Sequence, residues 1–203
     1  MMVASQFNLL TLLGLKSHHN LLDFGCGSLR VGKCLIPYLN TGRYWGIEPN
    51  EWLINEAIKN ELGEDMLKIK KPKFIFDDGF DYQFNSKFDY IIAQSIFSHT
   101  NLKLFSKGLA NLYECLENDG IFLFTASISK KNYDKNEEWL YPGVAKYKKQ
   151  TLFNLFNKRL KFWKKLNWYH PTQTWFIATK NKKKIPSFFK NLFLGINFVN
   201  KYI

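Results

Sequence analysis

The chain has 203 residues, enough for one domain with a buried core, and 46% of them are hydrophobic, which excludes a disordered chain. Three cysteines are too few for a disulfide framework, and no Cys/His cluster has metal-ligand spacing, so we expect no metal. No apolar run reaches the roughly 18 residues that cross a bilayer. The first 15 residues lack the basic start and cleavage site of a signal peptide, so we expect a cytoplasmic protein.

The formal net charge of +12 is unevenly distributed. Residues 1–129 carry 12 Lys+Arg and 14 Asp+Glu, a balance of −2, whereas residues 130–203 carry 17 and 3, a balance of +14. The basic half is suited to an anionic partner such as nucleic acid, a phosphorylated glycan or a membrane surface. Alternatively, the abundance of Asn, Lys, Ile and Phe reflects AT-rich codons alone. We expect one domain over residues 1–181 and a basic, apolar tail over residues 182–203.

Short apolar runs and segments of helical spacing alternate along the chain. We expect strands at residues 20–24, 43–48, 73–76, 88–94 and 121–126, and helices at 29–39, 52–58 and 102–116, the last of them capped by residues 118–120. Residues 160–167 and 174–179 are joined by a connection too short for a parallel crossover, so they should form an antiparallel hairpin. The pattern predicts an α/β fold with a Rossmann-like, doubly wound, mostly parallel seven-stranded sheet ending in that hairpin.

A glycine turn follows the first expected strand. Gly25 and Gly27 lack the Cβ atoms that would block a ligand, and the following helix start offers free N–H donors to a carboxylate or a pyrophosphate. An ordinary strand–helix turn is the alternative. Glu48 ends the next expected strand, where a carboxylate accepts hydrogen bonds from both ribose hydroxyls of an adenosine-containing ligand. The alternative for Glu48 is a solvated side chain at a strand end.

Two features favour S-adenosylmethionine over a dinucleotide as that ligand. The dinucleotide fingerprint requires a third glycine for tight helix packing at the pyrophosphate, and this chain has Arg30 there. The expected terminal hairpin also distinguishes the sheet from that of a plain dinucleotide-binding fold.

Four stretches, in this order, resemble motifs I, II, IV and V of class I S-adenosylmethionine-dependent methyltransferases: LLDFGCGSLRVGKCLIPYL, YWGIEPN, FDYIIAQSIFSHT and LYECLENDGIFLFTA. The resemblance runs from about residue 20 to residue 180, which is most of the chain. It departs from the family at Ser28-Leu29, where many members have a third glycine. The resemblance implies a methyltransferase with S-adenosylmethionine as its cofactor.

The resemblance also implies which residues bind the cofactor. The methionine part would be framed by Asp23, Phe24, Gly25, Cys26 and Gly27, and Arg30, on the first helical turn, would pair with its carboxylate. The ribose would be held at Glu48 and Pro49, and the adenine amino group would contact Asp77 or Asp78. Gln94 and Ser95 would lie beside the methyl group. Asp77 is preferred because it lies 11 residues before Phe88, the usual family spacing. A turn-forming Asp77 and a surface Arg30 are the alternatives.

Two histidines are candidates for acid/base chemistry. His99 lies just past the fourth expected strand, where open α/β sheets place their ligands, and it could deprotonate a hydroxyl or amine. His170 lies in the hairpin connection, which could overhang an acceptor pocket. The alternative for His99 is a structural role, as a helix cap or beside the adenine. The alternative for His170 is a hairpin-turn residue bonded to the backbone.

Missing motifs narrow the methyl acceptor. No N/D-P-P-Y/F/W sequence follows the fourth expected strand, which disfavours methylation of adenine or glutamine amino groups, and no cysteine lies there for covalent attack on cytosine. We expect a hydroxyl, amine or carboxyl of a small molecule, glycan or lipid as the acceptor. An RNA or other nucleic-acid methyltransferase and a non-catalytic nucleotide-binding domain are the alternatives. Aromatic residues within 127–147 would stack on the acceptor or form a lid.

Overall fold

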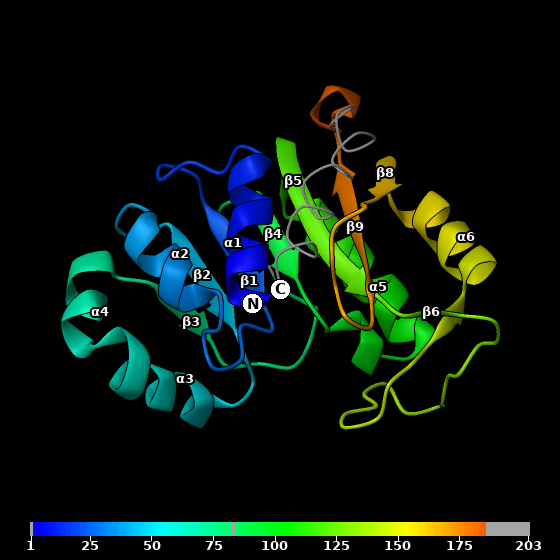
Figure 1. The fold of residues 1–203 in the computed structure, drawn as a ribbon, viewed down its shortest axis with the longest axis horizontal. Helices are drawn as coiled ribbons and strands as arrows, with labels where there is room; N and C mark the ends of the chain where they lie inside the picture. The colour runs from blue at the N-terminus through cyan, green and yellow to red at the C-terminus, as the bar shows by residue number, and fades with distance from the viewer. Residues whose placement is uncertain (1, 83, 186–203) are drawn as a thin grey trace, which may run out of the picture.

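A seven-stranded sheet forms the middle of the domain in the computed structural model, which describes residues 2–82 and 84–185 (Figure 1). Its strands are β1 (Leu21–Phe24), β2 (Tyr44–Ile47), β3 (Lys73–Ile75), β4 (Phe88–Ala93), β5 (Leu116–Ala126), β8 (Phe162–Lys165) and β9 (Thr174–Thr179). The strand order is β3-β2-β1-β4-β5-β9-β8. Only β9 runs antiparallel to its neighbours, β5 and β8. The mostly parallel sheet ending in a hairpin is therefore confirmed.

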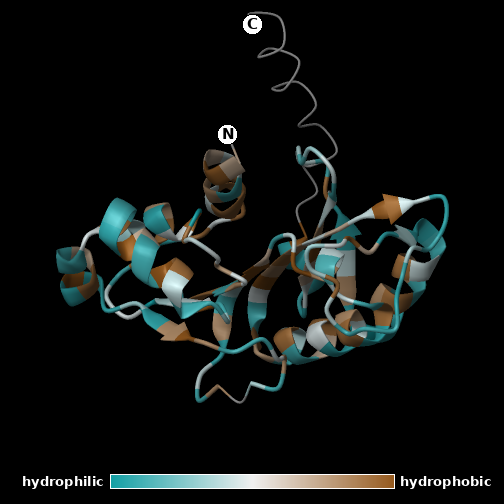
Figure 2. Cartoon of the chain, turned by 90° about the horizontal axis from the view of Figure 1, so that it is seen from below, coloured by the Kyte–Doolittle hydropathy of each residue, from teal (hydrophilic) through white to brown (hydrophobic). Residues whose placement is uncertain are grey.

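Helices cover both faces of this sheet. They are α1 (Met2–Leu12), α2 (Gly32–Tyr38), α3 (Glu51–Ala57), α4 (Glu64–Lys70), α5 (Leu102–Glu114) and α6 (Lys149–Arg159), with a π-helical turn η1 (Ile58–Leu62) and short 3-10 turns η2 (Phe97–His99) and η3 (Lys182–Lys184). Residues of α1, α2 and α3 pack in one buried cluster and those of α5 and α6 in another. Seen from the edge where the parallel strands end, apolar residues run through the strands between the two helical layers (Figure 2). The domain therefore has three layers, with the sheet between two layers of helices.

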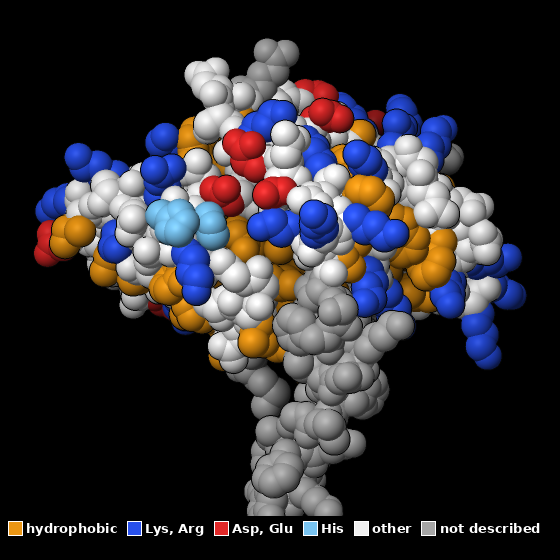
Figure 3. Space-filling model, turned by 90° about the horizontal axis from the view of Figure 1, so that it is seen from above, with side chains coloured by type: hydrophobic (Ala, Val, Ile, Leu, Met, Phe, Trp, Pro, Cys, Tyr) orange, Lys and Arg blue, Asp and Glu red, His pale blue; other side chains and the backbone are white. Residues whose placement is uncertain are grey.

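The opposite edge of the domain carries both signs of charge. Lys and Arg side chains lie close to Asp and Glu side chains in the centre of this face (Figure 3).

No helix within residues 2–82 and 84–185 has the length and hydrophobicity needed to span a bilayer. In the same residues, no three His, Cys, Asp or Glu side chains are grouped as a metal site would require. The rest of the expected tail, residues 186–203, lies outside the described residues.

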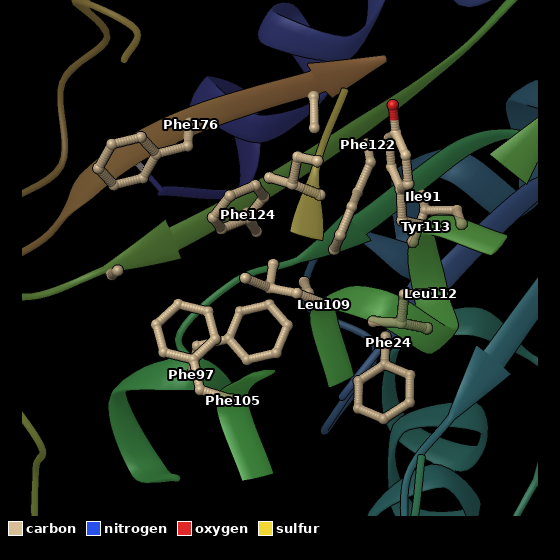
Figure 4. Close-up of a cluster of buried hydrophobic side chains, with 14 of the residues drawn as sticks. Phe24, Ile91, Phe97, Phe105, Leu109, Leu112, Tyr113, Phe122, Phe124 and Phe176 are labelled. Carbon is tan, nitrogen blue, oxygen red and sulfur yellow. The ribbon is translucent and has the colours of Figure 1, made fainter. Parts of the chain in front are cut away.

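Phenylalanines stack through the core between the sheet and α5. Phe80 stacks on Phe24 with ring centroids 4.7 Å apart, and Phe97 lies between Phe80 at 6.0 Å and Phe105 at 4.3 Å. Figure 4 shows Phe97 and Phe105 side by side beneath β5. Trp139 extends the stack by packing on Phe80 at 5.9 Å. The aromatic stack thus fixes the segment after β4, which contains Phe97, against the body of the domain.

Two expected helix boundaries were wrong, and the fifth strand begins five residues earlier than expected. Helix α5 ends at Glu114, and residues 118–120 do not cap it but belong to β5, because Leu116 is buried and pairs with Phe88 of β4. Helix α2 begins at Gly32 instead of at residue 29, because Leu29 has a positive φ of 53° and cannot continue a right-handed helix. Residues 127–147 contain a short parallel pair, β6 (Ile128–Ser129) with β7 (Tyr147–Lys148), at their ends.

Candidate functional site

The parallel strands β1, β2 and β4 end at the same edge of the sheet, and a tight loop follows β1 there. Gly25 and Gly27 have φ values of +73° and +53°, which L side chains rarely adopt. The N–H groups of Gly25 and Cys26 both donate to the carbonyl of Ile47, at 2.8 and 3.0 Å. These bonds hold the start of the loop against the end of β2.

The two glycines face different surroundings. A Cβ atom on Gly25 would lie 1.9 Å from Cδ1 of Ile96, which follows β4, whereas one on Gly27 would meet nothing within 4 Å. Gly25 therefore lets the loop close onto the end of β4. Gly27 leaves its open side free for a ligand, as expected for a loop that binds a cofactor through its backbone.

Glu48 holds this loop to the segment after β2. Its side chain is 8% exposed; Oε2 accepts from the N–H of Gly27 at 3.2 Å, and Oε1 accepts from the backbone and side-chain nitrogens of Asn50 at 3.1 and 2.8 Å. A carboxylate offers about four acceptor positions, so one remains on Oε2, and rotation of the exposed Asn50 side chain would free another. The arrangement fits two ribose hydroxyls at Glu48.

Asp23, at the end of β1, is enclosed. It is 4% exposed, and its Oδ2 accepts a hydrogen bond of 2.8 Å from the hydroxyl of Tyr44. Burial raises the pKa of Asp23 to about 7, although the bond from Tyr44 acts in the opposite direction. Burial, together with the nearby Asp23, also raises the pKa of the Tyr44 hydroxyl and of the Cys26 thiol well above their ordinary values. Burial therefore favours the protonated carboxyl of Asp23 over the carboxylate.

The remaining residues of the glycine loop are divided between the core and the surface. The side chain of Phe24 belongs to the aromatic stack, and that of Cys26 is buried, so only their backbone atoms line the loop. Arg30 is exposed and precedes α2, whose N-cap is Val31. The expectation that Arg30 lies on the first helical turn is wrong, because the helix starts two residues later.

The segment after β2 and the segment after β3 border the loop from the other side. Pro49 is exposed directly after Glu48. Asp77 and Asp78 are both exposed after β3, and Oδ1 of Asp77 accepts from the N–H of Gly79 at 2.6 Å. Asp77 thus forms the turn that was the alternative for it.

A polar network lies where β4 ends and β9 begins. Ser95 has a positive φ of 60°, and its N–H donates to Oγ1 of Thr125 at 2.8 Å. The side-chain nitrogen of Gln173 donates to Oγ of Ser95 at 3.0 Å and to Oγ of Ser98 at 3.2 Å. These bonds bring the connection between β8 and β9 against the segment that follows β4.

His170 belongs to this network with a fixed tautomer. Its Nδ1 accepts from the N–H groups of Thr172 at 3.2 Å and Gln173 at 3.0 Å, so the hydrogen of the neutral ring is on Nε2. Burial lowers the pKa of His170, which favours this neutral form. The amide of Gln94 lies 3.4 Å from Nε2, and its oxygen accepts that hydrogen once the amide is rotated by 180°. His170 is therefore arranged as a hydrogen-bond donor and not as a base at Nε2.

His99 has the opposite arrangement. Its Nδ1 lies 2.7 Å from the carbonyl oxygen of Gly143, and because a carbonyl can only accept, Nδ1 carries the hydrogen. The lone pair of the neutral ring is then on Nε2. The ring of Tyr141 packs edge-on at 5.3 Å. Of the two histidines, only His99 has its outer nitrogen ready to accept a proton.

Three residues of this region were not anticipated from the sequence: Tyr44, Ser98 and Gln173. Tyr44 lies 21 positions from Asp23, and Gln173 lies 75 positions from Ser98. The register of β1 with β2, which places Leu21 opposite Tyr44, would have indicated the first contact. The second has no local signal, because it depends on how two loops meet.

Comparison with known proteins identifies the family. A family model described as a methyltransferase domain matches residues 22–122. No curated protein matches the chain. Among solved structures, magnesium protoporphyrin IX methyltransferase from Synechocystis PCC 6803 with bound S-adenosylmethionine is 15% identical, with 89% of this chain and 78% of that chain covered and a TM-score of 0.63.

Two further methyltransferase structures have the same fold. One, from Clostridium acetobutylicum ATCC 824, is 14% identical, with 88% of this chain and 91% of that chain covered and a TM-score of 0.64. The 1,6-didemethyltoxoflavin-N1-methyltransferase of Burkholderia thailandensis is 15% identical, with 88% and 77% covered and a TM-score of 0.62. The sheet order, the glycine loop with Glu48 and the family match agree, so the chain belongs to the class I S-adenosylmethionine-dependent methyltransferases, with S-adenosylmethionine as its cofactor.

Proposed function

We propose that the chain methylates a hydroxyl, amine or carboxyl group of a small molecule, glycan or lipid, with His99 as the general base for an acceptor that must lose a proton. The observation that carries this proposal is the bond from Nδ1 of His99 to the carbonyl of Gly143, which places the lone pair of the neutral ring on Nε2, just past β4. The sulfonium of the cofactor supplies an already activated methyl group. The protein has to align the acceptor and remove its proton.

In this proposal the cofactor lies along the ends of β1, β2 and β4. Its ribose is held at Glu48 beside Pro49, its methionine part at the loop from Asp23 to Gly27 with Arg30 near the carboxylate, and its adenine near Asp77 or Asp78. Gln94 and Ser95 are beside the methyl group. The open side of Gly27 and the spare acceptor positions of Glu48 support this placement.

We expect Glu48→Ala to weaken S-adenosylmethionine binding by about 100-fold, because two hydrogen bonds to a charged acceptor contribute about 3 kcal/mol together. Titration calorimetry measures the affinity. Glu51→Ala, which removes an exposed carboxylate three residues later on α3, is the matched control and should bind normally. Circular dichroism shows whether the fold is kept. Unchanged affinity in a folded Glu48→Ala protein would contradict the ribose assignment.

Several features support a small acceptor over RNA. The segment after β4 is covered by two loops: Gln173 of the hairpin connection bonds to Ser98, and Ala145 of the 127–147 segment donates to the carbonyl of Ser98 at 2.7 Å. Two of the methyltransferases compared above are named for a porphyrin and a toxoflavin precursor, both small molecules. The three cysteines are all free, which supports a reducing, cytoplasmic location.

Transfer of a radiolabelled methyl group tests the acceptor class. The purified protein is incubated with labelled cofactor and with separate small-molecule, lipid, glycan, protein and RNA fractions of a cell extract. We expect label in a small-molecule, lipid or glycan fraction. Label that appears in RNA and is lost after ribonuclease treatment would instead favour the nucleic-acid alternative, for which the +14 balance of residues 130–203 is the supporting observation.

A further inference from the structure

Gln173 reaches from the start of β9 to the segment that follows β4, and its amide has only one orientation. The amide nitrogen is within hydrogen-bond distance of the hydroxyls of Ser95 and Ser98. The single hydroxyl hydrogen of Ser98 already goes to the carbonyl of Ser95, at 3.1 Å, so Oγ of Ser98 must accept from Gln173. The nitrogen of Gln173 therefore faces the serines and its oxygen faces away from them.

That oxygen is a buried acceptor without a donor. Within the described residues, Oε1 of Gln173 has no hydrogen-bond partner, and the same holds for the indole N–H of Trp175, which is 1% exposed. Trp175 lies on β9, two residues after Gln173 and next to β5 in the sheet. A buried polar group without a partner is costly, and a ligand that supplies the missing donor recovers that cost.

We propose that Gln173 positions the methyl acceptor by accepting a hydrogen bond from a hydroxyl or amine of that acceptor; the inference rests on the proposed function. The amide is held by Ser95, which in that proposal lies beside the methyl group. His170 presents Gln173 there, because its ring nitrogen holds the backbone N–H of Gln173. The acceptor therefore carries a hydrogen-bond donor at or near the atom that is methylated.

The same two loops carry exposed aromatic rings. Tyr141 is 79% exposed in the 127–147 segment and Tyr169 is 54% exposed in the hairpin connection, one residue before His170. Both loops meet at Ser98. Tyrosine rings suit a flat apolar partner, so the acceptor class we infer is a planar ring compound that bears a hydroxyl or an amine.

Gln173→Leu tests the inference, since leucine removes both amide functions at similar size. With the extract fraction that wild-type protein labels, we expect the half-saturating amount of fraction to rise about tenfold or more, as for a lost neutral hydrogen bond. The affinity for S-adenosylmethionine should stay unchanged. Gln150→Leu, at an exposed position of α6, is the matched control and should behave as wild type. Gln173→Met takes the place of the leucine variant if that protein does not fold.

If no extract fraction gains label, that result counts against the proposed function alone. A binding experiment then still decides the role of Gln173. Phenol and anisole differ in that only phenol donates a hydrogen bond, and saturation-transfer NMR compares their binding in the presence of S-adenosylhomocysteine. We expect wild-type protein to prefer phenol and the Gln173→Leu protein to lose the preference. Equal preference in both proteins, or weakened cofactor binding in the variant, would overturn the inference; the second result would assign the oxygen to the cofactor.

Discussion

Replacing His99 by asparagine is expected to lower the rate constant for methyl transfer by ~10²–10⁴-fold, the usual contribution of a positioned general base. Asparagine keeps an N–H donor near the position of Nδ1, so the bond to the carbonyl of Gly143 can persist while the proton-accepting Nε2 is lost. The rate is measured at saturating cofactor with the extract fraction that wild-type protein labels. Cofactor affinity, measured by calorimetry, should not change.

Two further variants separate the chemistry from the packing of the loop. His99→Ala removes both nitrogens and should be at least as slow as the asparagine variant, with easier proteolysis of the 127–147 segment, which also bonds to the backbone of His99 through Leu140. Tyr141→Phe leaves His99 untouched and should keep the wild-type rate. A His99→Asn protein that transfers methyl groups at the wild-type rate would show that His99 has only a structural role.

Asp23→Asn is expected to stabilise the protein increasingly as the pH rises. The pKa of Asp23 is raised from 3.8 to about 7 in the folded protein, so between these values the folded state binds more protons than the unfolded state, and the free energy of unfolding falls as the pH rises. Each pH unit costs about 1.4 kcal/mol over this range, or about 4 kcal/mol in all. Asparagine cannot ionise, and its oxygen still accepts from Tyr44.

Urea unfolding at pH 5, 6 and 8 measures this effect. The difference in unfolding free energy between Asp23→Asn and wild type should grow with pH up to about 7 and then stay constant. Asp65→Asn removes a carboxylate that is 89% exposed, and it should show no such trend. A difference between Asp23→Asn and wild type that is the same at pH 5 and pH 8 would mean that Asp23 is not held neutral by burial.

The sheet could be predicted because its signals are local. The buried strand β1 is an apolar run, and the short connection before β9 allows only a hairpin. The ends of α2 and α5 could not be predicted, because they depend on a positive φ at Leu29 and on the pairing of Leu116 with Phe88. Tertiary pairing overrode the helical spacing of Leu116.

In the candidate site, likewise, the sequence could place the residues that directly follow a strand but not the contacts between distant loops. Glu48 and the two glycines of the loop follow strands whose positions the sequence indicates. The contact of Gln173 with Ser98 joins two loops that are far apart in sequence, and the ring hydrogens of His99 and His170 are set by backbone atoms of Gly143 and Thr172. No residue pattern encodes such contacts.

The loops that meet at Ser98 lie outside residues 22–122, the stretch that matches the methyltransferase family model. The glycine loop after β1 and Glu48, where we propose that the methyl donor binds, lie inside it. An ancestral chain could therefore have exchanged its acceptor by changing two peripheral segments while the methyl-donor pocket stayed the same. Both segments bond to Ser98, so a new acceptor requires the two segments to change together. Among relatives, exchange of one segment alone should therefore be rarer than exchange of both.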